Sequence, residues 1–261
     1  MSELAATLLL VSDPGELEEA VAEARAGGSV GLDTEFLREK TYKAKLCLLQ
    51  LATRRAIYLV DPLAGLDLRE VGDLISDPAV EVVVHAGRQD FELFYVGWGI
   101  VPRNVFDVQV AAGFAGLGGS LPYGRLVQAA TGVALEKGES YSDWCKRPLT
   151  PSQLDYAADD VRYLLPAREH LGARLEQMGR TDWVREEMKL LEDPATYSID
   201  VNEVWRKVSG RGSLSGRQVS VLRELARWRE ETALRRDIPR GWVVKDQVLV
   251  ELARRAPTAA A

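Results

Sequence analysis

Two acidic residues stand two positions apart at the end of an apolar segment: Asp33 and Glu35 in SVGLDTE, residues 29–35. In a strand, side chains two positions apart point to the same face of the sheet. Neighbouring carboxylates repel each other unless a cation lies between them, and oxygen ligands suit a hard divalent ion. Taken alone, the pair is more simply explained as two caps of the following turn, so its chemistry depends on which other residues accompany it.

A third acidic residue, Asp90, lies in HAGRQDFELF, residues 85–94, directly after the apolar segment VEVVV. The pattern predicts a strand followed by an amphipathic helix, with Asp90 in the first helical turn. A negative charge there interacts favourably with the helix dipole, which by itself is a sufficient explanation. His85 is interpreted as a strand-end residue rather than a ligand.

Tyr156 and Asp160 form the third candidate group, in LDYAADDVRYLL, residues 154–165. A spacing of four places both on one face of a helix. A phenol beside a carboxylate can hold and polarise a water molecule, although a surface Tyr–Asp hydrogen bond would also explain the pair.

These residues must be positioned by an α/β framework. Apolar segments of β type predict strands at 29–35, 46–52, 56–61 and 80–85. Helical patterns occur near 68–76, 88–97, 104–113, 121–131, 215–235 and 245–254. Thr150, Pro151 and Gln153 form a strong helix start, and this helix is expected to run toward residue 177 with a kink at Pro166.

The charge distribution divides the chain into two parts. The net charge of the 261 residues is −6, which does not by itself indicate nucleic-acid binding. Residues 200–261, however, hold 13 Lys and Arg against eight Asp and Glu, so an acidic body is followed by a basic segment. This asymmetry suggests an appendage that binds a polyanion, with an ordinary solvated helical surface as the alternative.

The remaining features predict a cytoplasmic protein. The chain has no uncharged apolar run of membrane-spanning length, and its first residues do not resemble a signal peptide. Cys47 and Cys145 lie in unrelated contexts. They therefore predict neither a disulfide framework nor a zinc site, in keeping with a reducing compartment.

The acids and the tyrosine together resemble a known family. The order D-x-E, H-x4-D and Y-x3-D resembles the three exonuclease motifs of the DEDDy branch of the DnaQ-like superfamily. The stretches DTEFLREKTYKAKLCLLQLA and SYSDWCKRPLTPSQLDYAADDVRYLL are similar to ribonuclease D, and the resemblance covers residues 8–190. It implies an α/β fold with a ribonuclease-H-like mixed five-stranded sheet flanked by helices.

Residues 204–255 resemble the first part of an HRDC domain, a small all-α nucleic-acid-binding module, and the match ends early. The expected organisation is a DEDDy 3′–5′ exonuclease domain at 1–192, a linker at 193–203 and an incomplete HRDC-like module at 204–261.

The resemblance implies a metal-dependent 3′–5′ exoribonuclease that releases nucleoside 5′-monophosphates from a free 3′-hydroxyl end. Its implied cofactors are two divalent ions per site, Mg²⁺ or Mn²⁺. Asp33, Glu35 and Asp160 would hold the first ion, with Asp33 bridging to the second. Asp90 would support that second ion, and Tyr156 would orient the attacking water.

The implied partner is RNA with a single-stranded 3′ end, such as a tRNA precursor in 3′-end maturation. The protein is expected to be a monomer without a membrane partner. Two alternatives remain open: a 3′–5′ DNA exonuclease, because metal-ion hydrolysis scarcely depends on the 2′-hydroxyl, and a catalytically silent nucleic-acid-binding scaffold. A silent scaffold should have lost at least one of the acids, and all are present.

Overall fold

The computed structural model describes residues 7–135 and 142–255. Its contacts divide the chain into two compact units. The first comprises the chain up to Leu37 together with Leu46–Tyr197. The second comprises Arg38–Lys45 and the chain from Ser198 onward.

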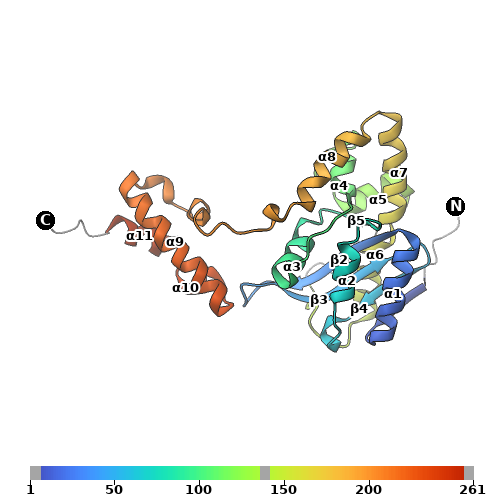
Figure 1. The fold of residues 1–261 in the computed structure, drawn as a ribbon, viewed down its shortest axis with the longest axis horizontal. Helices are drawn as coiled ribbons and strands as arrows, with labels where there is room; N and C mark the ends of the chain where they lie inside the picture. Colours follow the sequence, from blue (N-terminus) through green and yellow to red (C-terminus); the bar gives the residue numbers. More distant parts are fainter. Residues whose placement is uncertain (1–6, 136–141, 256–261) are drawn as a thin grey trace. The chain divides into compact units, whose positions relative to one another are not determined.

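The first unit contains a six-stranded sheet in the order β1-β4-β3-β2-β5-β6. Figure 1 shows β2, β3, β4 and β5 of this sheet with helices packed around them. Its strands are β1 (Thr7–Val11), β2 (Ser29–Leu37), β3 (Lys45–Ala52), β4 (Ala56–Val60), β5 (Glu81–Val84) and β6 (Val105–Asp107). β4 pairs with β3 antiparallel and with β1 parallel, while β5 pairs parallel with both β2 and β6. The sheet is therefore mixed, as the resemblance implied.

The expected number of five strands is wrong, because the described sheet has six. The sequence patterns did not predict two of these strands, β1 and β6. β1 is an edge strand whose leucines are largely exposed, so it lacks the alternation of a half-buried strand. β6 has three residues inside a segment expected to be helical from 104. Asp107 ends that strand and also caps the helix that follows it.

Helices cover both faces of this sheet. They are α1 (Pro14–Gly27), α2 (Arg69–Ile75), α3 (Arg88–Trp98), α4 (Val108–Phe114), α5 (Tyr123–Thr131), α6 (Pro151–Arg162), α7 (Leu164–Gln177) and α8 (Thr181–Glu192). On one face, the hydroxyl of Tyr58 donates to Glu23 of α1 over 3.0 Å. On the other face, a Cβ added at Gly31 would lie 3.2 Å from Leu164 of α7. β2 therefore passes directly beneath α7.

The helix expected from 151 toward 177 is two helices. α6 ends at Arg162 and α7 begins at Leu164, so the helix is interrupted at Tyr163 instead of continuing through a kink. Pro166 explains the position of the break. Its nitrogen carries no hydrogen for the carbonyl of Arg162, four residues earlier, and its ring crowds that carbonyl.

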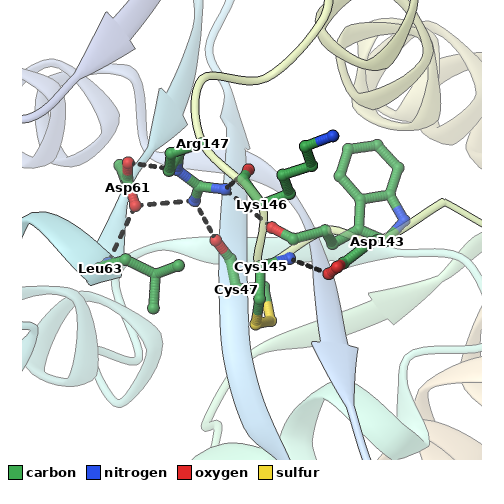
Figure 2. The surroundings of a disulfide bond; sticks show 8 residues. Cys47, Asp61, Leu63, Asp143, Cys145, Lys146 and Arg147 are labelled. Carbon is green, nitrogen blue, oxygen red and sulfur yellow. Dashed lines mark hydrogen bonds and ion pairs between the residues drawn. A yellow bond between two sulfur atoms is a disulfide. The ribbon is translucent and has the colours of Figure 1, made fainter.

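Cys47 and Cys145 form a disulfide, which contradicts the prediction from their sequence contexts (Figure 2). The Cα atoms lie 5.1 Å apart although 98 positions separate the residues. The link joins β3 to the segment that leads into α6. Because the prediction of a cytoplasmic location used the absence of a disulfide, it loses that support.

Arg147 holds the same segment by polar contacts. Its guanidinium donates to both carboxylate oxygens of Asp61 over 2.6 and 2.8 Å, and to the carbonyl of Cys47 over 2.6 Å (Figure 2). A bidentate Arg–carboxylate pair has a fixed orientation. Two independent restraints therefore fix the start of α6.

The second unit is small and mainly helical. It contains α9 (Gly216–Arg236), α10 (Arg240–Val243), α11 (Asp246–Arg254) and the 3₁₀ turns η3 (Val204–Lys207) and η4 (Arg211–Ser213). A third such turn, η2 (Pro194–Thr196), precedes it, and η1 (Pro62–Ala64) follows β4. A compact apolar core includes Val208, Leu222, Ala226 and Leu249, none of which is exposed.

The loop between β2 and β3 belongs to this second unit. The hydroxyl of Tyr42 donates to Glu230, and the guanidinium of Arg240 lies 5.1 Å from the centre of the Tyr42 ring. The backbone N–H of Lys43 donates to Asp237 over 2.9 Å. Among the described helices of both units, none is both long enough and apolar enough to cross a membrane.

Candidate active site

The site begins on β2, which carries Asp33 and Glu35. Gly31 faces α7, so the alternation of the strand directs Asp33 and Glu35 to the same side. Both carboxylates are partly buried. The alternation that the sequence indicated therefore holds, and it aims the pair at the layer that contains α6 and α7.

Asp90 enters the site from the first turn of α3 and is only 7% exposed. The hydroxyl of Thr34 donates to its carboxylate. Thr34 thus attaches α3 to β2 between the two acids of the D-x-E motif. Sequence reasoning missed this threonine, whose only signal is its place in the middle of that motif.

Asp107 supports the turn that presents Asp90. Its carboxylate accepts the N–H groups of Ala86 and Gly87, each over 3.1 Å, and also caps α4 at Gln109 over 2.8 Å. Ala86 has a φ of 56°, a conformation that costs energy in a residue with a side chain. Asp107 therefore holds a strained turn between β5 and α3, and this orients the helix that carries Asp90.

Tyr156 and Asp160 lie one turn apart on α6, as their spacing predicted, and the tyrosine hydroxyl donates to the carboxylate. The neighbouring Asp159 forms an ion pair with Arg162 over 2.8 Å. The aromatic ring of Trp144 lies 5.9 Å from that of Tyr156. Asp160 rather than Asp159 is therefore the acid available to the site.

The helix start that carries these two residues is the one indicated by the sequence. The N–H of Gln153 donates to the Thr150 hydroxyl over 3.2 Å, and the N–H of Thr150 donates to the Gln153 side chain over 2.9 Å. This reciprocal capping box fixes the first turn of α6. The phase of the helix is thereby fixed as well, which decides where Tyr156 and Asp160 point.

Burial raises the pKa values of all four acids, and repulsion from other acids of the site adds to this for Asp33 and Glu35. Burial raises the pKa of Asp33 well above its ordinary value, and repulsion from the other three acids adds to this. Burial followed by repulsion from Asp160 and Asp90 raises the pKa of Glu35 to about 8. Burial raises the pKa of Asp160 to about 7 and that of Asp90 to about 6. The acids thus lie close enough together to repel, although more than 120 positions separate Asp33 from Asp160.

Tyr123 is a further neighbour that sequence reasoning missed. Burial and the negative charge of Asp160 raise its pKa, and its hydroxyl donates to the carbonyl of Asp159 over 3.2 Å. Its ring lies 5.3 Å from that of His85, whose Nε2 is 2.9 Å from the carbonyl of Leu121. No motif in the sequence marked this tyrosine.

The donor set suits a hard divalent cation in its chemistry. All four acids supply oxygen, and burial together with repulsion between carboxyl groups raises the pKa values of Asp33 and Glu35, an effect that a bound cation would oppose. Within residues 7–135 and 142–255, no three His, Cys, Asp or Glu side chains are arranged so that they enclose an ion.

A cavity of about 630 Å³ lies elsewhere in the first unit, between β6, α7 and α8. Arg168 and Glu81 both line this cavity, and the Arg168 guanidinium donates to the two carboxylate oxygens of Glu81 over 2.5 and 2.8 Å. None of the five predicted site residues lines it.

Comparison with known proteins shows the family to which the chain is related. A family model described as 3′-5′ exonuclease matches residues 9–176, and a model of the HRDC domain matches residues 218–261. The chain is 45% identical to ribonuclease D of Acidiphilium cryptum (strain JF-5), over 87% of this chain and 58% of the relative. It is 40% identical to ribonuclease D of Xanthomonas oryzae pv. oryzae, over 95% of this chain and 68% of the relative.

Among solved structures, Escherichia coli RNase D aligns with a TM-score of 0.88 and 34% identity, over 95% of this chain and 66% of that one. The catalytic core of RRP6 from Trypanosoma brucei shares the fold, with a TM-score of 0.75 and 24% identity over 99% of this chain and 73% of that one. Ribonuclease D of Granulibacter bethesdensis matches at 43% identity over 95% of this chain. The chain spans 58% and 63% of the length of the Acidiphilium and Granulibacter relatives.

Proposed function

Because the chain belongs to the ribonuclease D family of 3′–5′ exonucleases, we propose that it hydrolyses RNA from a free 3′-hydroxyl end and releases nucleoside 5′-monophosphates. The observation that carries this proposal is the gathering of four carboxylates and a tyrosine from β2, α3 and α6. Burying several carboxyl groups near one another is costly to the fold, and carboxyl groups with raised pKa values are typical of functional sites.

The proposed cofactors are two divalent ions, Mg²⁺ or Mn²⁺. Asp33, Glu35 and Asp160 would hold one ion, and Asp90 would support the second, toward which Asp33 would bridge. When bound, such a pair neutralises the phosphate, lowers the pKa of water and stabilises the leaving oxygen. Oxygen donors favour Mg²⁺ or Mn²⁺ over softer metals.

Tyr156 has the role of orienting the attacking water. Burial and the charge of Asp160 raise the pKa of its hydroxyl far above neutral pH, so the group keeps its proton. A phenol of that kind is a poor general base. It can donate to Asp160 and position the water by its remaining lone pair, which directs the nucleophile at the phosphorus.

RNA is the proposed substrate class. The Escherichia coli relative is described as an exoribonuclease involved in structured RNA processing, and the basic second unit offers cations for a polyanion. A single-stranded 3′ end, as in a tRNA precursor, is the form that can thread its terminal nucleotide into a buried site. We further propose that the protein acts as a cytoplasmic monomer.

The decisive experiment compares RNA and DNA oligonucleotides labelled at the 3′ or the 5′ end, in Mg²⁺, Mn²⁺ or EDTA. Stepwise shortening of 5′-labelled RNA, with early release of the 3′ label as a mononucleotide, is expected only with a divalent ion. Faster cleavage of DNA would favour the alternative DNA exonuclease. Binding without cleavage would favour a silent scaffold, and cleavage of circular RNA would refute the requirement for a 3′ end.

Two substitutions make the experiment specific to the site. Asp33→Asn should abolish cleavage, because an amide cannot supply the full negative charge that an ion requires. Asp155→Asn is the matched control, since Asp155 is an exposed acid of α6 with no ion-pair partner among the described residues. Equal activity of the two variants would show that cleavage does not depend on this carboxylate cluster.

A further inference from the structure

Gln50 interrupts the apolar part of β3, and its side chain is fully buried. Neither the nitrogen nor the oxygen of its carboxamide has a hydrogen-bond partner among the described residues. Burying an amide without a partner costs free energy, because the group gives up its hydrogen bonds to water. A packed apolar core would be served better by a leucine, so the amide needs an explanation.

The side chain of Gln50 points to the face of the sheet that carries the candidate site. Gln50 pairs with Leu59 of β4, and Ala52 pairs with Ile57. Leu59, Ile57 and Ala52 belong to one apolar cluster with residues of α6 and α7. Tyr58, which lies between the two β4 residues, contacts α1 on the opposite face. Because residues opposite each other in an antiparallel pair share a face, Gln50 faces α6 and α7.

On this face, Gln50 is the neighbour of Asp33. β2 and β3 are adjacent strands, and residues 38–44 are too short a connection for parallel strands, so the pair is antiparallel. A Cβ added at Gly31 would lie 3.3 Å from that of Ala52, which places these residues opposite each other. Two positions further along β2, and two positions back along β3, Asp33 lies opposite Gln50. Such residues have Cβ atoms about 5 Å apart, a separation that a glutamine amide can span.

Asp33 is the acceptor that lies next to the Gln50 amide within the sheet. The other neighbours of Gln50 on this face are Leu48 and Ala52 along β3 and Leu59 across on β4, all apolar and buried. The residues of α6 that are buried in the same cluster are apolar as well. Among these described neighbours, only Asp33 offers an acceptor in its side chain.

The unpaired polar atoms of the first unit are found beside the site. Within residues 7–37, 46–135 and 142–197, buried side-chain atoms without a partner occur at Gln50 and at Trp144, whose indole nitrogen is unpaired. The ring of Trp144 lies 5.9 Å from that of Tyr156. Unpaired buried groups that gather at one place are explained when they serve the function of that place.

We propose that Gln50 is a positioning residue of the site: its carboxamide N–H donates to the Asp33 carboxylate and fixes the orientation in which that carboxylate holds divalent ions. The role rests on the proposed two-ion function. The amide is uncharged, so it can direct one carboxylate oxygen and leave the other lone pairs to the ions. Groups that orient a ligating side chain in this way contribute to the affinity for the ion.

The test measures the affinity of the whole chain for Mn²⁺, with the free ion detected by electron paramagnetic resonance. Gln50→Leu keeps a side chain of similar size and removes the amide. Its affinity for Mn²⁺ is expected to be about 10–100-fold lower, the usual effect of removing a group that orients a ligand. Its melting temperature in EDTA is expected to stay equal or to rise, because an apolar group replaces an unpaired buried amide.

Leu51→Met is the matched control. Leu51 is the next residue of β3, is equally buried, and pairs with Tyr58, so it lies on the opposite face. This variant should bind Mn²⁺ as the wild-type chain does. An equal loss of affinity in both variants would overturn the role of Gln50, because general packing of β3 would then explain it. A lower melting temperature with unchanged affinity in Gln50→Leu would make Gln50 a structural residue only.

A second measurement uses the wild-type chain and does not depend on how the variants fold. Nuclear magnetic resonance follows the two side-chain amide protons of Gln50 during a titration with Mg²⁺. One of them is expected to move downfield, as a proton does when it is donated to a carboxylate. If neither proton moves while Mg²⁺ binds, the proposal fails.

The positioning role and the proposed hydrolysis fail in different ways. A chain whose affinity for Mn²⁺ depends on Gln50 but which never cleaves RNA would contradict the nuclease alone. Cleavage of RNA by the wild-type chain, with equal affinity for Mn²⁺ in Gln50→Leu, would contradict the role of Gln50 alone.

Discussion

The hydroxyl of Tyr156 donates to the carboxylate of Asp160 one turn later on α6, and it does so beside the acids of β2. Tyr156→Phe keeps the aromatic ring and removes only this donor. We expect kcat to fall by about 10²–10⁴-fold, the usual contribution of a group that positions or transfers a proton, with metal binding retained. Single-turnover hydrolysis of a short RNA measures the fall in the rate of the chemical step.

Tyr95→Phe is the control for that experiment. Tyr95 lies on α3 with its ring 5.8 Å from Tyr197, so it tests the loss of a phenol hydroxyl away from the acids. An unchanged kcat in Tyr156→Phe would make this tyrosine a packing residue.

Asp33→Asn should abolish hydrolysis without unfolding the protein. Its partly buried carboxylate is repelled by three other acids, so a neutral group of the same shape removes a destabilising charge. The melting temperature in EDTA is therefore expected to stay equal or to rise while activity disappears. A large fall in melting temperature would mean that Asp33 has a structural role instead.

The stability of the metal-free protein should depend on pH in an identifiable direction. The pKa values of Glu35, Asp160 and Asp90 in the folded protein are about 8, 7 and 6, against ordinary values of about 4. The folded protein therefore binds more protons than the unfolded chain between these limits. The free energy of unfolding must then fall as pH rises from about 4 to about 8.

Divalent ions should reverse this loss, because they bind the deprotonated acids and stabilise the folded state by mass action. Thermal melting in EDTA and in Mg²⁺ at pH 5 and pH 8 measures both effects, with the larger gain expected at pH 8. Asp61 behaves in the opposite way. Burial alone would raise the pKa of its carboxyl group, but hydrogen bonds from Arg147 lower the pKa below the ordinary value. The contribution of Asp61 to stability is therefore lost only in more acidic solution. Stability in EDTA that rises from pH 5 to pH 8 would contradict the prediction.

Reduction of the disulfide should destabilise the first unit. Cys47 and Cys145 close a loop of about a hundred residues, and a native disulfide typically contributes about 2–4 kcal/mol. Melting with and without a thiol reductant measures the loss, and alkylation with mass determination counts free thiols. The double variant Cys47→Ser with Cys145→Ser should be insensitive to the reductant. Two free thiols in the protein before reduction would contradict the structure.

Deletion of residues 200–261 should raise KM for RNA and flatten its dependence on salt, with kcat on a short oligonucleotide little changed. Contacts made far from the scissile bond bind substrate and transition state alike, so their loss appears in KM. The deletion also removes Glu230, the partner of Tyr42 in the loop between β2 and β3. A large loss of melting temperature with an unaltered KM would mean that this unit braces the loop and does not bind RNA.

Local patterns in the sequence were sufficient for the parts of the site that depend on neighbouring residues. Alternation places Asp33 and Glu35 on one face of β2, and helical spacing places Tyr156 and Asp160 on one face of α6. The capping box at Thr150 could also be predicted from the sequence, because the N-cap residue, the proline and the partner at the third position all act within one turn. The roles of these residues in hydrolysis remain predictions.

Only the tertiary structure decided the relationships that join distant segments. The bond between Cys47 and Cys145, the hydrogen bond from Tyr42 to Glu230 and the support of the turn after β5 by Asp107 have no local signature. β1 and β6 were missed for a related reason: an exposed edge strand lacks alternation, and a three-residue strand is too short to show it. The physical reason is common to all of them. Periodicity reports which face of an element is buried, whereas the partner on that face is selected by packing of the whole chain.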